Sequence, residues 1–459
     1  MRTDCSADLF AFEAVEGRRV EAAFDGGTMT SDAGALLLGR ADRRLGLLKR
    51  FAACFVDGRS SGVVEHTIER LVGQRVLGIA LGYEDVNEHD ELRHDPALAA
   101  TLGRLAARRS RCAALAGKST LNRLEHAPSG GAERYHRIGH VPEAIEALLV
   151  DVFLESHDRP PEEIGLDLDA TDDLIHGNQE GRFFHGYYGG YCSLPLYVFC
   201  GRHLRASKLR SSNIDGLAGA GEEVARIVGQ IRARWPEVRI VLRAESGFAR
   251  DALMAWCENN RVDYLFGLAR NARLVGQIEA ELAEAAIESA ASGAPARRFK
   301  DFLWTTLDSW SRRRRVVGKA EYTQGEANPR FVVTSLGQKR ADGHTLYEDL
   351  YCAPGEMENR IKQCQLDLFA DRTSTATMRA NQLRLWFASI AYVLLEGLRR
   401  IGLAATKLAD ATCGSIRLKL LKVAALVRIS VRRVRVAMAS SHPRQRDWAL
   451  AYAALGAQR

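Results

Sequence analysis

The spacing of hydrophobic residues changes along the chain, and the change predicts regions of different structure. In Ala33–Leu48 and Glu65–Leu81, apolar residues recur every three or four positions. This is the spacing of helices that bury one face. Ser31 stands before the first of these helices, where its hydroxyl can cap a free backbone N–H group. Residues 1–150 are therefore predicted to be mostly helical.

After Pro160 and Pro161 the pattern alternates between short apolar runs and helical spacing. Such alternation predicts an α/β fold, in which helices cover a sheet. The expected strands are Ile164–Ala170, Leu194–Cys200, Val238–Arg243 and Val262–Leu268, and the expected helices are Gly221–Trp235 and Ala249–Asn260.

Residues 271–350 interrupt this alternation. A helix rich in Ala and Glu (Leu274–Ala291) precedes three β-prone segments, Phe302–Leu307, Arg315–Tyr322 and Arg330–Leu336. These features predict a strand-rich insert, and from Glu356 the chain is predicted to be helical to its end. The expected regions are 1–150, helical and DNA-binding; 160–270, the first part of a core; 271–350, the insert; 351–405, the completion of the core; and 406–459, basic and helical.

Composition adds limits to this picture. The 459 residues are 46% hydrophobic and 26% charged, which is typical of a folded protein with several domains. The apolar stretch Leu385–Leu395 is shorter than the roughly 20 residues needed to cross a bilayer. Acidic residues occupy the N-terminal stretch where a signal peptide is apolar. We therefore expect a cytoplasmic protein without a membrane partner.

The nine cysteines include no C-x-x-C pair, which argues against a disulfide framework or a zinc ribbon.

Three acidic residues indicate a possible chemistry. Asp169 in IGLDLDATDD and Glu245 in LRAESGF follow apolar, strand-like runs, whereas Glu358 in GEMENRIK lies near a helix start. Carboxylates so placed can hold a pair of Mg²⁺ ions, which stabilise the attacking and leaving oxygens of phosphoryl transfer. Asp167 is expected on the same strand face as Asp169. The alternative is that each acid is an ordinary turn or cap residue.

Basic residues indicate a polyanionic partner. The net charge is +7, and one cluster of cations is interleaved with Leu and Val. These cations are predicted to face DNA phosphates, although a merely solvated face remains the alternative. The cluster contains Arg417, Lys419, Lys422, Arg428, Arg432, Arg433 and Arg435, and a second cluster is Arg312–Arg315.

Two weaker signals lie elsewhere. Lys118 in AGKST resembles the end of a phosphate-binding loop, but Cys112 stands where that motif needs glycine. A helix start is favoured there, with Lys118 in reach of DNA phosphate.

A further group of aromatic residues can stack on unpaired bases or pack in the core. This group is Phe183, Phe184, Tyr187, Tyr188 and Tyr191, beside His176, Glu180 and His185, whose spacing fits no zinc motif.

Long segments of the chain resemble one family. They are FDGGTMTSDAGALLLGRADRRLGL, QRVLGIALGYEDVNEHDELRHDP, LAGKSTLNRLE, LDLDATDDLIHGNQEGRFFHGYYGGYCSLPLY, LRAESGF, GEMENRIK and RANQLRLWFASIAYVLL. Through them the chain is similar, nearly end to end, to DDE transposases of bacterial insertion sequences, in the insertion-sequence 1380 group.

The resemblance implies an RNase H-like catalytic core with a strand-rich insert before the last acid. It implies cutting and joining of DNA with Mg²⁺ or Mn²⁺, as two ions held by Asp169, Glu245 and Glu358. The partners would be double-stranded DNA, both the terminal inverted repeats and the target, and a second copy in a DNA-bound homodimer. The protein would be nucleoid-associated, and Lys362 would contact phosphate, as would Lys118, Arg428, Arg432 and Arg433.

Three positions depart from the family pattern. Glu245 replaces Asp in an R-x-D-S-G-F setting, Pro354 replaces Arg, and Gln365 replaces Lys. These departures keep two alternatives open. One is a catalytically impaired or repurposed DNA-binding protein, and the other is a nuclease that does not join ends.

Overall fold

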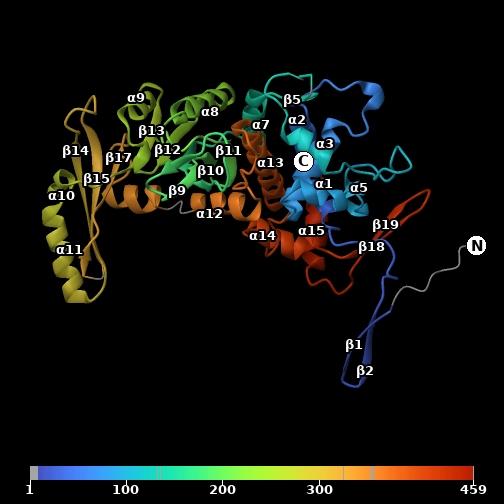
Figure 1. The fold of residues 1–459 in the computed structure, drawn as a ribbon. Coiled ribbons are helices and arrows are strands. Elements are labelled where there is room, and N and C mark those ends of the chain that lie inside the picture. Colours follow the sequence, from blue (N-terminus) through green and yellow to red (C-terminus); the bar gives the residue numbers. More distant parts are fainter. Residues whose placement is uncertain (1–8, 132, 135, 324, 353–355, 458–459) are drawn as a thin grey trace, which may run out of the picture. The chain divides into compact units, whose positions relative to one another are not determined.

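The computed structural model describes residues 9–457 except 132, 135, 324 and 353–355. The chain forms two compact units (Figure 1). Unit 1 consists of Met1–Ala127, Ala132–Ile138 and Ile390–Arg459, and unit 2 consists of Pro128–Gly131 and Gly139–Ser389. No helix among the described residues is long and apolar enough to cross a membrane.

Unit 2 is organised around a mixed sheet of nine strands. The strand order is β11-β10-β6-β12-β13-β17-β15-β14, and β16 pairs with β15. Strand β12 pairs in parallel with β6 and with β13, and the other pairings are antiparallel. The strands are β6 (Glu163–Ala170), β10 (Leu196–Cys200), β11 (His203–Lys208), β12 (Arg239–Ala244), β13 (Val262–Leu268), β14 (Ala296–Trp304), β15 (Arg314–Thr323), β16 (Glu326–Ala327) and β17 (Arg330–Thr334).

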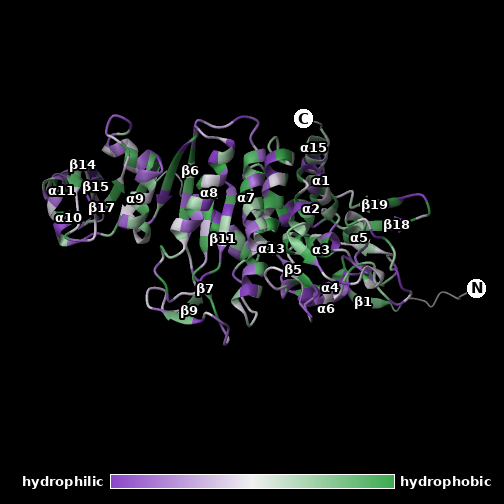
Figure 2. Cartoon of the chain, turned by 90° about the horizontal axis from the view of Figure 1, so that it is seen from above, coloured by the Kyte–Doolittle hydropathy of each residue, from purple (hydrophilic) through white to green (hydrophobic). Residues whose placement is uncertain are grey.

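Helices with one apolar face pack on this sheet. Helix α8 (Ala220–Arg234) buries Val224, Ile227, Val228 and Ile231, whose spacing puts them on one side. They share a core with apolar residues of β6 and β12. Apolar and polar residues accordingly both occur along α8 (Figure 2). The other helices here are α7 (Pro142–Glu155) and α9 (Asp251–Asn259). The alternating strands and helices predicted from the sequence are confirmed.

The predicted strand-rich insert extends the central sheet itself. Strand β17 pairs with β13, and β15 and β14 follow outward. The predicted helix is present as α10 (Ala272–Gln277) and α11 (Glu279–Ser292), and the first β-prone segment begins earlier than expected, at Ala296. The remaining elements of this region are β7 (Asp173–Leu174), β8 (Phe183–His185), β9 (Gly190–Ser193), the 3-10 turn Ser246–Phe248, α12 (Glu356–Lys362), α13 (Met378–Gly397) and two π-helical segments, Thr345–Tyr351 and Gln363–Asp367.

Unit 1 is mainly helical, but its first helix differs from the prediction. The N-cap position is Gly34, which supplies no side-chain cap, and Ser31 instead donates its hydroxyl to Asp32. Gly46, at φ +62°, divides it into α1 and α2. Two strands, β1 (Phe10–Val15) and β2 (Arg18–Ala22), form a hairpin before it. The other elements are β3 (Met29–Thr30), α1 (Ala35–Leu45), α2 (Leu47–Ala52), β4 (Phe55–Asp57), α3 (Ile68–Leu81), α4 (His89–Leu92), α5 (Pro96–Thr101), α6 (Lys118–Glu125), β5 (Ile138–His140), α14 (Cys413–Ile416) and α15 (Gln445–Gly456), with shorter turns at Ser61–Val63 and Val86–Glu88 and π-helical segments Leu398–Gly402 and Arg417–Leu421.

The prediction that the basic region 406–459 is helical throughout is wrong. Strands β18 (Ala425–Ile429) and β19 (Val434–Met438) form a hairpin, and β18 also pairs with β3. Val427, Ile429, Val434 and Val436 are β-branched residues at alternate positions. Such residues favour a pleated strand over a helix. The strand-like alternation of these β-branched residues therefore outweighs the helical spacing inferred from the basic residues.

Segments far apart in the sequence join where β18 begins. The backbone N–H groups of Ala33 and Gly34 donate to the carbonyls of Val423 and Leu421, both at 3.1 Å. Lys422 Nζ lies 2.7 Å from Oδ1 of Asp32, which is buried. Unit 1 therefore needs its N-terminal and C-terminal segments together.

Gly34→Ala is expected to destabilise unit 1. A Cβ atom at Gly34 would lie 2.2 Å from the Cα of Leu421, and the opposing atoms are backbone that cannot rotate away. Overpacking of this kind costs about 1–3 kcal/mol. Urea titrations of the full chain measure the effect. Gly62→Ala is the matched control, since nothing lies within 4 Å of that position. Equal midpoints for the two variants would contradict the close approach.

Candidate active site

The parallel pairing of β6 and β12 places Asp169 and Glu245 at neighbouring strand ends. In the register of these strands, Ala244 is opposite Leu168. Asp169 follows Leu168 within β6, and Glu245 directly follows the last residue of β12. On its other side, Asp169 is paired with Tyr197 of β10. The structure thus brings two of the three predicted acids together.

The charges of the three acids influence one another. The pKa of Asp169 is raised to about 7, first by burial, and further by the negative charges of Glu245 and Glu358. The Asp169 carboxyl is therefore partly protonated near neutral pH. A positive charge beside such a carboxyl would stabilise its ionised form.

Glu358 has a different local environment from the other two acids. It is the third residue of α12, and its side chain is 73% exposed. Lys362, one helical turn later, holds its Nζ atom 2.7 Å from Oε1 of Glu358. Glu358 is thus close enough to raise the pKa of Asp169, and it also forms an exposed ion pair with Lys362. Pro354, the second departure from the family pattern, lies outside the described residues.

Asp167 shares the strand face expected for it, but an arginine occupies both its oxygens. Nε and Nη2 of Arg243 lie 2.6 and 3.0 Å from Oδ1 and Oδ2 of Asp167. Arg243 also donates to the carbonyl of Leu350 at 3.2 Å. This bidentate pair ties β6 to β12 immediately before the two candidate acids. The sequence analysis missed Arg243, although it stands two residues before Glu245.

Two tyrosines that border the carboxylates were given little or no role by the sequence. Tyr188 donates its hydroxyl to the carbonyl of Ala170 at 3.2 Å, and burial and nearby acids, Asp169 among them, raise its pKa to about 12. Burial and the charge of Glu245 raise the pKa of Tyr351 to about 12 as well. Gly267 makes room for Tyr351, because a Cβ there would lie 2.5 Å from the tyrosine oxygen.

Gln365, where the family pattern has Lys, is part of a second polar cluster. Its amide donates to Oδ1 of Asp173 at 2.9 Å and to the carbonyl of Asp172 at 3.2 Å. Asp173 is buried, and burial together with Asp371 and Asp172 raises its pKa to about 8. Gln365 thus hydrogen-bonds a neighbouring carboxyl group. A cavity of about 290 Å³ is lined by Gln365, Asp172 and Asp173.

The residues present fit a divalent metal in chemistry, but they do not form a closed site. Asp169, Glu245 and Glu358 offer only carboxylate oxygens, the donors that Mg²⁺ and Mn²⁺ prefer. Burial and the charges of Glu245 and Glu358 raise the pKa of Asp169, and a bound cation would offset these effects. Across the described residues, however, no three His, Cys, Asp or Glu side chains are grouped closely enough to hold a metal ion.

The predicted DNA-contacting residues lie in varied settings. Lys118 begins α6, and its Nζ atom is 3.5 Å from Oδ2 of Asp90. Lys362 is paired with Glu358. Arg428, Arg432 and Arg433 are exposed on the β18–β19 hairpin.

The aromatic group is divided between surface and site. Phe183, Phe184, Tyr187 and Tyr191 are exposed on or beside the three-stranded sheet β7-β9-β8, whereas Tyr188 is partly buried. Glu180 accepts a backbone hydrogen bond from Met378 at 3.0 Å, and the His185 and Tyr188 rings are 4.9 Å apart. The core-packing alternative therefore does not hold for the exposed members.

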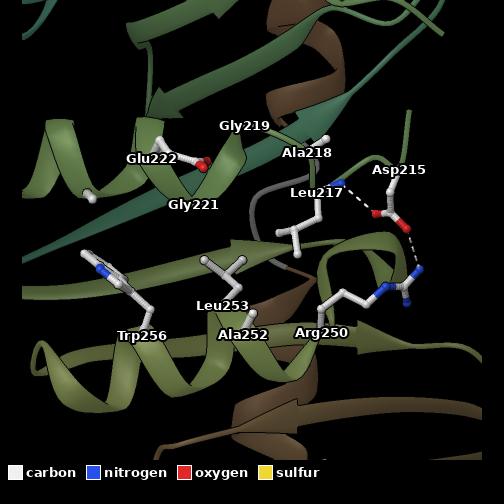
Figure 3. A pocket seen from close by; sticks show the side chains of 11 residues that line it. Asp215, Leu217, Ala218, Gly219, Gly221, Glu222, Arg250, Ala252, Leu253 and Trp256 are labelled. Carbon is white, nitrogen blue, oxygen red and sulfur yellow. Dashed lines mark hydrogen bonds and ion pairs between the residues drawn. The ribbon is translucent and has the colours of Figure 1, made fainter. Parts of the chain in front are cut away.

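A larger cavity of about 710 Å³ lies away from the predicted acids, between the starts of α8 and α9 (Figure 3). Leu217, Leu253 and Trp256 give it an apolar lining, and Nη2 of Arg250 pairs with Oδ2 of Asp215 at 3.1 Å. Asp169, Glu245 and Glu358 do not line it.

Comparisons with known proteins give one assignment. A family model described as transposase DDE domain group 1 matches residues 12–459. A solved piggyBac transposase synaptic complex with hairpin DNA is similar at a TM-score of 0.41 and 10% identity, over 82% of this chain and 79% of that chain. That similarity is too low to support an argument. No curated protein matches the chain.

Stability of the metal-free protein is expected to fall as pH rises from about 4 to 7, because of Asp169. Its pKa is about 7 in the fold against 3.8 as its ordinary value. Between these values the folded state holds more protons, so raising the pH favours unfolding. Asp169→Asn has no titrating carboxyl at this position, so its unfolding free energy should fall less over this pH range, by a difference of at most about 4 kcal/mol. The difference should be smaller than this limit because the carboxyl is partly exposed. Urea titrations with a chelator present would show the two proteins diverging up to pH 7. A constant difference over that range would exclude the raised pKa.

Proposed function

Because this chain belongs to the transposase DDE domain group 1 family, we propose that it is a DNA transposase of the insertion-sequence 1380 type. It binds the terminal inverted repeats of its element, cleaves the DNA at their ends and joins the freed 3′ ends to target DNA. Its catalytic core is RNase H-like. It acts as a homodimer on DNA, in the cytoplasm at the nucleoid.

The observation that supports catalysis best is the electrostatic coupling of Asp169 with Glu245. Their strands pair in parallel, and the charge of Glu245 helps to hold the pKa of Asp169 near 7. A partly buried carboxyl kept beside a second acid is unfavourable for folding alone. Perturbed acids at strand ends of an α/β sheet are typical of functional sites.

In the proposed mechanism, Asp169, Glu245 and Glu358 would hold Mg²⁺ or Mn²⁺, as two ions. Such ions, when bound, promote attack by water and stabilise the attacking and leaving oxygens of the phosphodiester. Arg243 fixes the spacing of β6 and β12 through Asp167, and so positions both acids. Lys362 is released from Glu358 and contacts phosphate. The enzyme contributes chiefly positioning and charge neutralisation.

A second candidate function is a repurposed DNA-binding protein with little catalysis. Two observations favour it. Glu358 is neutralised by Lys362, and Gln365 is committed to Asp173. A nuclease without joining activity would use the same acids as the transposase, and only a strand-transfer assay distinguishes these two.

Asp169→Ala is expected to abolish Mg²⁺-dependent cleavage of linear DNA bearing the element's ends, while binding to that DNA stays nearly intact. Removal of a metal ligand leaves the basic hairpin of unit 1 untouched. Gel-shift and cleavage assays on the same DNA measure both properties. Undiminished cleavage by the variant would refute the assignment of Asp169.

A companion variant should show the opposite behaviour. Neutralising Arg428, Arg432 and Arg433 together to Gln should weaken binding and flatten its salt dependence. Each lost phosphate contact lowers the slope of log K against log salt by about 0.9. An unchanged slope would identify this cluster as a solvated surface.

Glu245→Asp is expected to raise Mg²⁺-dependent strand transfer. Glu carries its carboxylate about 1.5 Å further from the backbone than Asp, one C–C bond. Mg²⁺ requires oxygens at about 2.0–2.1 Å in near-octahedral geometry, and a 1 Å misplacement can cost on the order of 100-fold in rate. The measurement is single-turnover strand transfer in Mg²⁺ and in Mn²⁺. Slower transfer by Glu245→Asp would mean that the pocket has adapted to Glu. Unchanged activity of Glu245→Ala would remove this residue from the metal site.

A further inference from the structure

The β18–β19 hairpin of unit 1, residues 425–438, is called here the C-terminal arm. Among the described residues, its strand pairing with the rest of the unit is confined to its base. At the base, Ala425 pairs with Thr30 and Leu426 pairs with Met29 of β3. Val423 and Ala425 share a small core with Ala33, and Val436 packs against it. Beyond Val427 the strands pair only with each other and extend past the helices of unit 1 (Figure 1).

The two faces of the arm differ in chemistry. Cross-strand pairs are Val427 with Val436 and Ile429 with Val434 on one face, and Arg428 with Arg435 on the other. The apolar face is buried near the base but exposed further out, where Ile429 is 52% accessible. The arm thus presents an apolar strip on one side and two guanidinium groups on the other.

The arginines of the arm have no acidic partner. Two like charges directly opposite on neighbouring strands destabilise the pair. Nevertheless Arg428 faces Arg435, and no ion pair joins either of them to an acid among the described residues. The sequence has no Asp or Glu between Asp410 and Asp447. A charge arrangement that is unfavourable in the free protein is expected where a polyanion supplies the missing partner.

The β1–β2 hairpin gives an internal comparison. It is exposed along its whole length, and it too has a valine and an arginine at its turn, Val15 and Arg18. There, however, Arg18 pairs with Glu16 at 3.0 Å. Arg18 thus has an acid within its own turn, whereas the turn of the arm contains none.

The tip of the arm is a tight, fixed turn. Ser430 donates its backbone N–H to the carbonyl of Arg433 at 2.9 Å, and its hydroxyl accepts the N–H of Arg433 at 3.2 Å. This turn holds Val431 and Arg432 outward, and Val431 is fully exposed. A fully exposed β-branched residue beside an arginine gains nothing in the free protein, since its apolar surface stays in water.

We propose that the C-terminal arm enters the major groove of duplex DNA and reads base edges there with Val431 and Arg432, while Arg428 and Arg435 bind the flanking phosphates. This inference rests on the proposed DNA-binding function and adds sequence recognition to it. The major groove is about 12 Å wide and admits a two-stranded ribbon, whereas the minor groove is about half as wide. Thymine methyl groups suit Val431, and the O6 and N7 atoms of guanine suit the forked Arg432 side chain.

The test begins with a duplex pool that carries 20 randomised base pairs, from which the full-length wild-type protein selects a binding sequence. In the selected duplex each thymine is replaced in turn by uracil, which removes only the major-groove methyl group. Affinities are then measured for wild type, Val431→Ala and Arg432→Lys. Dimethyl sulfate protection identifies the groove, because guanine N7 lies in the major groove and adenine N3 lies in the minor groove.

One thymine-to-uracil change is expected to weaken wild-type binding about fourfold, the factor for one buried methylene. The same change should not affect Val431→Ala. Arg432→Lys keeps the charge but loses the fork, and should reduce the preference for one guanine about fivefold or more. Val15→Ala and Arg18→Lys, in the β1–β2 hairpin, are matched controls and should behave as wild type.

The groove assignment is overturned if the wild type selects no sequence, or if every uracil change affects wild type and Val431→Ala equally. Protection of adenine N3 alone would equally overturn it in favour of the minor groove. These results would leave the proposal of DNA binding intact, because the salt dependence of the triple arginine variant tests that proposal separately. Loss of DNA binding in the wild type would instead refute the proposed function.

Discussion

The parallel pairing of β6 with β12 is the constraint on which the candidate site depends. It brings Asp169 beside Glu245, and the pairing must therefore outweigh two unfavourable effects, the partial burial of a carboxyl group and its repulsion by a second one. The Arg243–Asp167 pair, two residues back along the same strands, is bidentate and partly buried. It holds the strands in this register where the charge of the two acids would separate them. Strand β10 on the other side of β6 completes the support.

Much of unit 2 could be predicted from local sequence. Strand and helix spacing located β6, β12, α8 and α9, and the two strand-end acids followed from them. Asp167 shows the limit of such reasoning. Its place on the strand face was predictable, but its partner Arg243 belongs to another strand, and only the sheet register brings them together. Likewise, the helix start of Glu358 was visible in the sequence, whereas its pairing with Lys362 depends on side-chain rotamers.

The errors lie where two patterns compete in one segment. In the C-terminal region, basic residues between Leu and Val resemble a helical face, yet the β-branched residues alternate and β3 offers an edge to pair with. The N-cap expected at Ser31 was displaced because Asp32 and Gly34 are held by the segment 421–423. Contacts between residues about 390 positions apart decide both outcomes, and no local window contains them.

The way in which unit 1 is assembled has a consequence for synthesis in the cell. Its two main parts lie on either side of residues 139–389 in the chain. At about 5–20 residues per second, translation of that intervening length takes roughly 10–50 s. During this interval the first part of unit 1 lacks the strands and backbone acceptors that complete it. Unit 2 can close while still tethered to the ribosome, and its carboxylates then exist before the basic arm does. Unit 1 can therefore complete its fold only after the whole of unit 2 has been synthesised.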